Sequence, residues 1–309
     1  MPKIVNKNIL KEVCKPRPEN SHKYNFGYLL VVGGSQLYSG PPAIAAMAAL
    51  RAGVDMSLII APERSANIIA SFSPNFIAYP LKGHDIGPSH VPAMLSFTKA
   101  GRKVSNEKIA VLIGNGLGRD EETQKATRDY LSQIQTPVVI DADGIWAVAK
   151  DKKIFRNKKI VLNCHTYGFY ILSKIDISDL EEKKKAEVIG QVAADLGATI
   201  IVTGNTDIIS DGKEVVFNET GTPDMTVGGT GDALAGICGC FLSQGIEPFL
   251  AAKAATYING KAGELASDDF GVGLLATDVV DNIPRVMMDE RIIGKHAKGK
   301  KTIGEHIIE

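Results

Sequence analysis

Short apolar runs alternate along this chain with longer stretches of helical period, and this alternation restricts the possible folds more than any other feature. We predict six of these runs as strands: Tyr28–Val32, Met56–Ala61, Ile109–Ile113, Val138–Asp141, Ile160–Asn163 and Thr199–Val202. Nearly every one is apolar throughout, which is typical of parallel strands covered by helices on both faces of a sheet. The sequence therefore predicts a doubly wound α/β fold with a mostly parallel sheet.

Helical stretches connect the runs, and one segment departs from the pattern. The predicted helices are Pro41–Ala52, Glu121–Ile134, Lys183–Leu196, Gly231–Gln244 and Pro248–Ala266. After the third helix, Ile208–Ser210 and Glu214–Phe217 flank an Asp-Gly turn, which predicts a hairpin at the sheet edge. No repeat and no linker rich in Pro, Gly or Ser divides the chain. We expect a single domain over residues 1–309, with a core at about 22–285 and a polar tail at about 286–309.

Charge and cysteine usage exclude several classes of function. Lys and Arg total 35, as do Asp and Glu, so no net field attracts nucleic acid or an anionic membrane. No leader and no apolar run of membrane-spanning length is visible, and none of the four cysteines has a CxxC partner. Cys238 and Cys240 fit small core residues better than metal ligands. We expect a cytoplasmic protein.

The strongest functional signal is the glycine-rich stretch from Val227 to Gly236, which leads directly into a helix. Backbone N–H groups freed by its glycines would converge at the helix N-terminus and form a seat for a phosphate. Asp232 beside such a phosphate would suffer repulsion, unless it accepts a proton from a hydroxyl that attacks the phosphate. The alternative is that Asp232 caps the helix.

Three other glycine-rich turns follow predicted strands, and each could have a structural role and not a binding role. Gly33-Gly34-Ser35 with Gly40 could receive a phosphate or ribose, or could serve close helix packing. The GxGxG at residues 114–118 is a weak dinucleotide signal. The last turn could close over an adenine and ribose, or could simply join a strand to the hairpin, and it reads Thr203-Gly204-Asn205-Thr206-Asp207.

Four further side chains lie near the predicted carboxyl ends of strands. Asp141 and Asp143 could hold magnesium through water, although capping of the next helix is the more economical interpretation. His165 follows a strand end, where a lone histidine is more often structural. We expect Trp146, the only tryptophan, to pack in the core beneath its helix.

Several motifs in register resemble the ADP/ATP-dependent NAD(P)H-hydrate dehydratases, a family of the ribokinase-like superfamily. The matching stretches are LLVVGGSQLYSGPPAIAAMAALRAG at 29–53, IGNGLG at 113–118, VVIDADG at 138–144, LNCHTYGF at 162–169 and NETGTPDMTVGGTGDALAGICGCFLSQG at 218–245. Together they span about residues 22–270 in the order of the family. The resemblance implies a ribokinase-like fold.

The resemblance also implies an activity and roles for particular residues. The family removes water from hydrated NADH or NADPH while it consumes ADP or ATP, and we expect a Mg²⁺ requirement and a homo-oligomer. By the family pattern, Asp232 deprotonates the ring hydroxyl, and the amides of Gly229, Thr230 and Gly231 form the anion hole. Gly231 and the turn at residues 203–207 hold the nucleotide. The hydrate pocket is lined by Gly40, Gly116, His165 and Asp232.

The chain departs from the family pattern at four positions. Gly168 stands where the family has glutamate, Thr203 where it has lysine, Asn115 where it has proline and Pro41 where it has alanine. Two alternatives therefore stay open: a ribokinase-like kinase of a small vitamin-precursor alcohol, and an adenylate-binding protein without turnover. We predict no metal ligands among the protein side chains.

Overall fold

The computed structural model describes residues 3–288, and a single sheet runs through this part of the chain. Its strand order is β1-β10-β9-β8-β7-β6-β5-β2-β3-β4. The strands are β1 (Lys3–Ile4), β2 (Tyr28–Val32), β3 (Met56–Pro62), β4 (Ile77–Leu81), β5 (Ile109–Ile113), β6 (Val138–Asp141), β7 (Ile160–His165), β8 (Thr199–Thr203), β9 (Asp207–Ser210) and β10 (Val215–Asn218). All neighbours from β4 to β8 pair in parallel, whereas β8, β9 and β10 pair antiparallel. The predicted mostly parallel sheet is confirmed.

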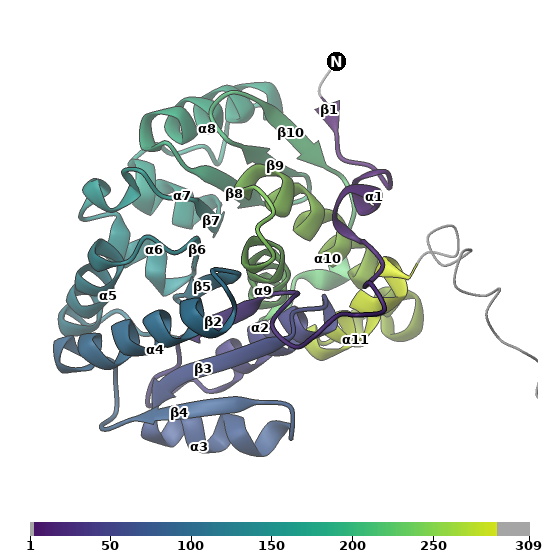
Figure 1. The fold of residues 1–309 in the computed structure, drawn as a ribbon. Coiled ribbons are helices and arrows are strands. Elements are labelled where there is room, and N and C mark those ends of the chain that lie inside the picture. The colour runs from purple at the N-terminus through teal and green to yellow at the C-terminus, as the bar shows by residue number, and fades with distance from the viewer. Residues whose placement is uncertain (1–2, 289–309) are drawn as a thin grey trace, which may run out of the picture.

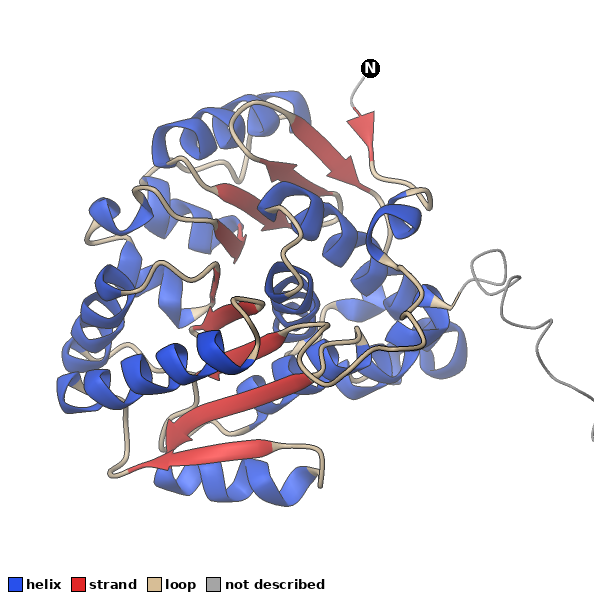
Figure 2. Ribbon diagram, viewed as in Figure 1, coloured by secondary structure: helices blue, strands red, loops and turns tan. Residues whose placement is uncertain are grey.

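Helices cover both faces of the sheet, as Figures 1 and 2 show. They are α1 (Ile9–Val13), α2 (Gly40–Arg51), α3 (Glu63–Phe72), α4 (Val91–Val104), α5 (Glu121–Gln133), α6 (Asp143–Val148), α7 (Thr166–Ser173), α8 (Glu182–Leu196), α9 (Thr230–Ser243), α10 (Pro248–Phe270) and α11 (Ala276–Met287). Helices α4 to α8 lie on one face and contribute to one core cluster, whereas α1, α2, α3, α9, α10 and α11 contribute to the other.

The sheet separates these two cores because every second side chain of a strand points to the opposite face. In β2, Leu29 and Val31 belong to the core under α2 and α9, whereas Leu30 and Val32 belong to the core under α4 and α5. All four are fully buried. This double burial is the physical reason that the six predicted strands carry no polar alternation, and all six are present.

Some elements differ from the expectation. The hairpin is present as β9 and β10, and the two-residue strand β1 adds parallel to its outer side. Strand β4 was not predicted, because it is an exposed edge strand that contains Pro80. Helix α11 continues to Met287, two residues beyond the expected core boundary. The rest of the expected tail, residues 289–309, lies outside the described residues.

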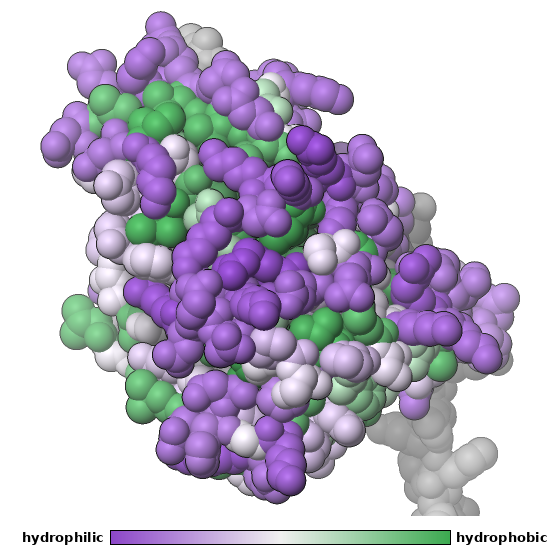
Figure 3. Space-filling model, turned by 90° about the vertical axis from the view of Figure 1, so that its left-hand side faces the viewer, coloured by the Kyte–Doolittle hydropathy of each residue, from purple (hydrophilic) through white to green (hydrophobic). Residues whose placement is uncertain are grey.

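The apolarity of the helices, the hydropathy of the surface and the location of the cysteines can be compared with what the composition predicts. Within residues 3–288, no helix combines the length and apolarity needed to cross a bilayer. The side built by α4 to α8 is largely hydrophilic with smaller hydrophobic areas (Figure 3). Cys238 and Cys240 are fully buried and unpaired in α9, so they are core residues as expected.

The strand order places a topological switch point between β2 and β5. From β2 the chain continues outward through β3 and β4, and from β5 it continues in the other direction through β6, β7 and β8. Open α/β sheets commonly bind ligands near such a point, but here the loops that follow β2 and β5 are in contact, because the Gly34 amide donates to the Asn115 carbonyl at 2.9 Å. The N-terminus of α9 lies at the carboxyl ends of β5 and β7, since Asn115 donates to Asp232 and Asn163 donates to the Gly231 carbonyl.

Candidate functional site

Two adjoining cavities lie at the carboxyl ends of the strands. The Asp232 cavity has a volume of about 220 Å³ and the Asp207 cavity about 440 Å³. The Asp232 cavity is lined by Arg119, Asp141, Ala142, Ile145, Trp146, Asn163, Cys164, His165, Gly168, Thr203, Gly229, Gly231 and Asp232. Thr203 and Gly231 also line the Asp207 cavity, so the two spaces meet at the first turn of α9.

The first turn of α9, called the amide seat below, presents backbone N–H groups that have no intrahelical acceptor. Gly229 is the N-cap residue with a φ of 104°, and the first helical hydrogen bond is donated by Ala233 to the Gly229 carbonyl. The hydroxyl of Thr230 donates to the carbonyls of Met225 and Val227 and so fixes the preceding loop. Because the amides of a first helical turn lack intrahelical acceptors, those of residues 230–232 are available to a ligand.

Asp232 occupies the third position of α9, and its side chain does not cap the helix. Its Oδ1 accepts a hydrogen bond of 2.6 Å from Nδ2 of Asn115, which follows β5. The same nitrogen donates to Oδ2 of Asp141 at 2.8 Å. The amide of Asn115 thus lies between two carboxylates, and the capping interpretation of Asp232 is wrong.

The surroundings of the two carboxylates shift their proton affinities. Burial raises the pKa of Asp232 to about 6, the bond from Asn115 opposes this shift, and the negative charge of Asp143 adds to it. Burial and the nearby Asp232 raise the pKa of Asp141 well above its usual value. A carboxylate with a pKa near 6 is largely ionised at neutral pH and still accepts a proton readily.

Asp143 and Asp141 hold the site together through bonds that the sequence did not indicate. Asp143 lies in the first turn of α6, where Oδ2 accepts from the Gly118 amide at 3.0 Å and Oδ1 accepts from Nε of Arg119 at 2.7 Å. Asp141 accepts from the amide of Ala142 and from the side chain of Asn163. No side-chain bond caps α6. In residues 3–288, no group of three or more His, Cys, Asp or Glu side chains is arranged to hold a metal ion.

Trp146 corrects the expectation of a core tryptophan. Its side chain is only partly buried and lines the Asp232 cavity, with the guanidinium of Arg119 at 4.4 Å from the ring centroid. The expectation failed because Trp146 lies one turn after Asp143, on the side of α6 that faces the cavity rather than the sheet. The sequence could have indicated that both residues lie near the site, because Arg119 directly follows Gly118 and Trp146 lies three residues after Asp143.

His165 has a structural role and also borders the cavity. Its Nδ1 accepts a hydrogen bond from the Tyr167 amide at 3.2 Å, so it caps α7. Gly168 is buried one turn later, and a Cβ there would lie 2.9 Å from Cβ of Cys164. Close packing explains the small residue at a position where the resembling family has glutamate.

Gly40 and Gly116 lie on the two loops at the switch point. A Cβ at Gly116 would lie 2.7 Å from Cβ of Tyr38 and 3.3 Å from Cγ of Pro41, and its φ is 63°. Gly40 opens α2 and has no neighbour within 4 Å of an added Cβ. Neither glycine is among the residues that line the two cavities, and their contact with a substrate stays a prediction.

The turn after β8 forms one wall of the Asp207 cavity. Thr203, Gly204, Asn205 and Asp207 line it, whereas Thr206 does not. Asp207 accepts from the Gly204 amide at 3.2 Å and from Nδ2 of Asn218 at 3.0 Å, which fixes the turn to the hairpin. Burial raises the pKa of Asp207 to about 6.

The opposite wall comes from residues to which the sequence analysis gave no individual role. It is formed by Thr220, Gly221, Thr222, Pro223, Met225 and Thr226 before α9, by Leu234 on α9, and by Asn259 and Gly260 on α10. The amide of Asn259 donates to the carbonyl of Thr230 at 3.3 Å. Asn259 is 52 positions from Asp207 in the chain, so no local pattern could have joined α10 to the turn.

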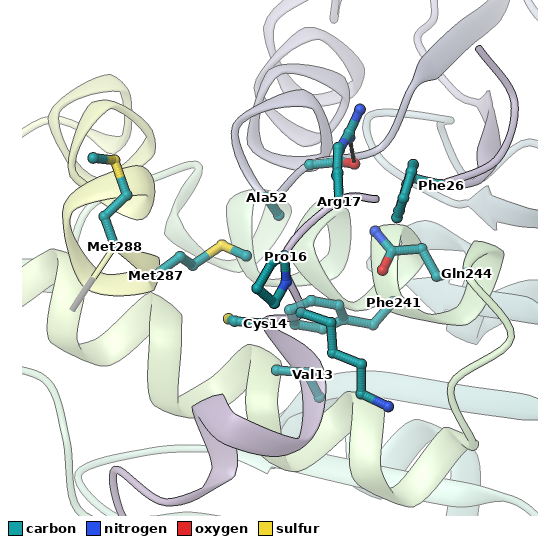
Figure 4. Close-up of a pocket in the computed structure, with 12 residues that line it drawn as sticks. Val13, Cys14, Pro16, Arg17, Phe26, Ala52, Phe241, Gln244, Met287 and Met288 are labelled. Atoms are coloured by element: carbon teal, nitrogen blue, oxygen red, sulfur yellow. Dashed lines mark hydrogen bonds between the residues drawn. The ribbon is translucent and has the colours of Figure 1, made fainter. Parts of the chain in front are cut away.

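A further cavity of about 260 Å³ lies away from these groups (Figure 4). It is bordered by residues 13–17 and by Phe241 and Gln244 at the end of α9 that is opposite to Asp232. Arg17 there donates to Oδ1 of Asp55 at 2.7 Å and to the Gly53 carbonyl at 2.6 Å. These bonds tie the N-terminal segment to the domain, and we assign this region a structural role.

Comparison with protein families gives a match over most of the chain. The family described as NAD(P)H-hydrate dehydratase matches residues 29–285. The bifunctional NAD(P)H-hydrate repair enzyme Nnr of Pyrobaculum aerophilum is 39% identical over 273 residues, which cover 88% of this chain and 52% of that protein. This chain therefore spans about half the length of the first curated relatives it matches. The ADP-dependent (S)-NAD(P)H-hydrate dehydratase of Nitrosopumilus maritimus is 30% identical over 285 residues, with 92% and 96% covered.

Solved structures show the same architecture. The ADP/ATP-dependent NAD(P)H-hydrate dehydratase from Bacillus subtilis, co-crystallized with ATP/Mg²⁺, superposes with a TM-score of 0.77 at 26% identity. The superposition covers 94% of this chain and 99% of the other. A ribokinase-like superfamily protein from Enterococcus faecalis superposes with a TM-score of 0.79 at 24% identity, over 93% and 95%. The latter likeness concerns the fold alone.

Proposed function

Because this chain belongs to the NAD(P)H-hydrate dehydratase family, we propose that it dehydrates hydrated NADH or NADPH at the expense of ADP or ATP. One observation carries the proposal: the carboxylate of Asp232 borders a cavity whose wall includes the amide seat at the start of α9. A base and an anion site in one cavity are what transfer of a phosphoryl group to a hydroxyl requires.

The proposed reaction has two steps. Asp232 accepts the proton of the ring hydroxyl while the hydroxyl oxygen bonds to the terminal phosphorus of the nucleotide. The bond from that phosphorus to the bridging oxygen breaks, so that ADP leaves from ATP, or AMP from ADP. The ring carbon–oxygen bond then breaks and inorganic phosphate leaves with the former hydroxyl oxygen, while the neighbouring ring carbon loses a proton to water and the ring double bond forms. The amides of Gly229, Thr230 and Gly231 would stabilise charge on the transferred group, and such donors contribute about 3–4 kcal/mol where measured.

The Asp207 cavity is the proposed nucleotide site. Its volume of about 440 Å³ is within the range of small-molecule pockets, and it reaches the amide seat at Thr230 and Gly231. Thr203, Gly204, Asn205 and Asp207 would form its nucleotide-facing turn. Asp207 would act by fixing the turn, because its Oδ1 accepts from the Gly204 amide and its Oδ2 from the side chain of Asn218.

Magnesium would reach the site on the nucleotide phosphates. Asp141 and Asp143 are engaged with Asn115, Asn163 and Arg119, so these two carboxylates do not present an open ligand set. Magnesium is usually bound through substrate phosphates and water with one or two carboxylates at most, and it neutralises phosphate charge during transfer. We predict that excess chelator lowers turnover at least about tenfold and that added Mg²⁺ restores it; full activity in chelator would contradict this.

Incubation with authentic NADH hydrate and each nucleotide tests the function directly. We expect recovery of the near-ultraviolet absorbance of NADH together with release of phosphate. A stable phosphorylated product from a vitamin-precursor alcohol would favour the alternative kinase. Absence of nucleotide consumption with the hydrate and with candidate alcohols would favour an adenylate-binding protein.

A pH profile tests the environment of the base. Since Asp232 must be ionised to accept a proton and its pKa is raised to about 6, kcat/KM should fall as the pH drops through about 6. Asn115→Leu removes the donor that favours the ionised form, so this limb should move to higher pH. Asp141, Asp143 and Arg119 are the other charged side chains near Asp232, and the negative charge of Asp143 opposes its ionisation.

Asn163→Leu is the matched control for the Asn115 change. Asn163 donates to Asp141 and to the Gly231 carbonyl but not to Asp232, so its loss should not raise the pH at which activity falls. Identical profiles for Asn115→Leu and wild type would show that the bond to Asp232 has no effect on the base.

We also propose a cytoplasmic homo-oligomer. Phe270, Val272 and Leu275 are exposed large apolar side chains around one short turn after α10, and Val272 is 96% exposed. Clusters of this kind commonly mark protein interfaces. Light scattering on the purified chain is expected to give a mass above that of one chain, and a monomeric mass would contradict the proposal.

A further inference from the structure

Arg119 is held in an unusually defined position for an exposed arginine. It follows the glycine turn after β5, and its side chain is 58% exposed. The Nε atom donates to Oδ1 of Asp143, and the guanidinium carbon lies 4.4 Å from the centroid of the Trp146 ring. The second oxygen of Asp143 accepts from the Gly118 amide, so one carboxylate fixes both the loop and the arginine.

The outer edge of this guanidinium is free. Among residues 3–288, Nη1 and Nη2 of Arg119 have no hydrogen-bond partner, and Arg119 is the sole Lys or Arg that lines the Asp232 cavity. Immobilising an arginine costs side-chain entropy, and a largely exposed ion pair offsets that cost only in part. An arginine oriented in this way has two parallel donors ready for a phosphate or carboxylate.

Aromatic rings extend the surface beside Arg119. The Trp146 ring lies 6.0 Å from that of Tyr167, and the Tyr167 ring is nearly parallel to His165 at 6.4 Å. Tyr167 is 55% exposed, so more than half of its surface is accessible to a ligand. A cation flanked by aromatic faces is suited to a ligand that combines phosphate with planar rings.

We propose that Arg119, oriented by Asp143 and supported by Trp146, binds a phosphate of the hydrated dinucleotide and thereby contributes to substrate affinity. The inference rests on the proposed function. Arg119 lines the Asp232 cavity but not the Asp207 cavity, which places it on the acceptor side of the phosphoryl-transfer centre. A dinucleotide offers its pyrophosphate and, in the NADPH form, a ribose 2′-phosphate.

Kinetics of Arg119→Met test the proposal. We expect the KM for the hydrate to rise on the order of tenfold or more, as loss of charged hydrogen bonds implies. The kcat and the KM for ADP or ATP should stay within about threefold of wild type. Arg119→Lys keeps the charge and loses the two-pronged geometry, so its KM should be intermediate. Arg102→Met is the matched control. Arg102 lies in the last turn of α4, pairs with Glu107 beyond the end of that helix, and lines neither cavity.

Two substrates separate the two phosphate sources. A rise in KM for both NADH hydrate and NADPH hydrate identifies the pyrophosphate, whereas a rise for NADPH hydrate alone identifies the 2′-phosphate. An unchanged KM for both hydrates overturns the proposal, and so does a rise confined to the nucleotide.

Trp146 offers a readout that does not depend on turnover, because it is the only tryptophan in the chain. Titration with NADP⁺ should change its fluorescence in wild type, and the half-saturating concentration should rise about tenfold or more in Arg119→Met. Equal titration curves for the two proteins would overturn the role of Arg119. Binding of NADP⁺ that depends on Arg119 in a protein without hydrate turnover would instead refute the proposed function and leave the binding role intact.

Discussion

Replacement of Asp232 by asparagine is expected to lower turnover by about 100-fold or more while nucleotide affinity stays near the wild-type value. The reason is that the amide cannot accept the hydroxyl proton, although its carbonyl oxygen can still accept the bond from Asn115. The nucleotide contacts lie in the Asp207 cavity, which Asp232 does not line. Steady-state kinetics and a nucleotide titration measure the two quantities separately.

Asp195→Asn is the control for this variant, since Asp195 is an exposed carboxylate on α8 whose hydrogen-bond partner within residues 3–288 is Gln191 of the same helix. It should leave turnover unchanged. If Asp232→Asn retained wild-type turnover, Asp232 would not be the base, and the mechanism above would be wrong. An equal loss of nucleotide affinity and of turnover would instead indicate a disturbed α9.

Gly236→Ala is expected to cause the largest loss of stability of any single methyl addition in α9. A Cβ at Gly236 would lie 2.0 Å from the carbonyl oxygen of Ala45, a backbone atom of α2. The two helices must therefore move apart, and overpacking of a well-packed core costs typically about 1–3 kcal/mol. Urea unfolding should show a lower midpoint with little change in slope.

Gly273→Ala provides the comparison for this stability measurement. Gly273 has no heavy atom within 4 Å of an added Cβ and no positive φ, so its midpoint should match wild type. Because α9 carries Asp232 and the amide seat, displacement of α9 from α2 should also lower turnover in Gly236→Ala. An unchanged midpoint would mean that the contact between the helices relaxes without cost.

One departure from the family pattern, Asn115 in place of proline, places a hydrogen-bond donor beside the proposed base. Proline, which the family has at this position, offers no side-chain donor, whereas the amide of Asn115 donates to Asp141 and Asp232. Thr203 is a different case. It lines both cavities at the place where the family has lysine, and its hydroxyl bonds weakly to the Cys164 carbonyl at 3.5 Å.

The core strands were predictable because a strand buried on both faces is a continuous run of apolar residues in the sequence. Tyr28–Val32 and Ile109–Ile113 were bounded correctly, since each apolar run ends where the chain leaves the sheet for a glycine loop. Edge strand β4 and the amphipathic helices α3 and α4 carry weaker signals, as half of each faces solvent. The hairpin was visible through its Asp-Gly turn.

The sequence by itself determined the double-sided sheet, the amide seat before α9 and the presence of Asp232 beside it, because each depends on neighbours within about ten residues. Three features were decided only by the tertiary structure. The side chain of Asn115 lies between Asp141 and Asp232, Trp146 lies against Arg119 and not in the core, and α10 forms part of the wall of the Asp207 cavity. Those contacts join segments up to 117 positions apart. Their formation depends on strand order and helix packing, which no local pattern of residues records.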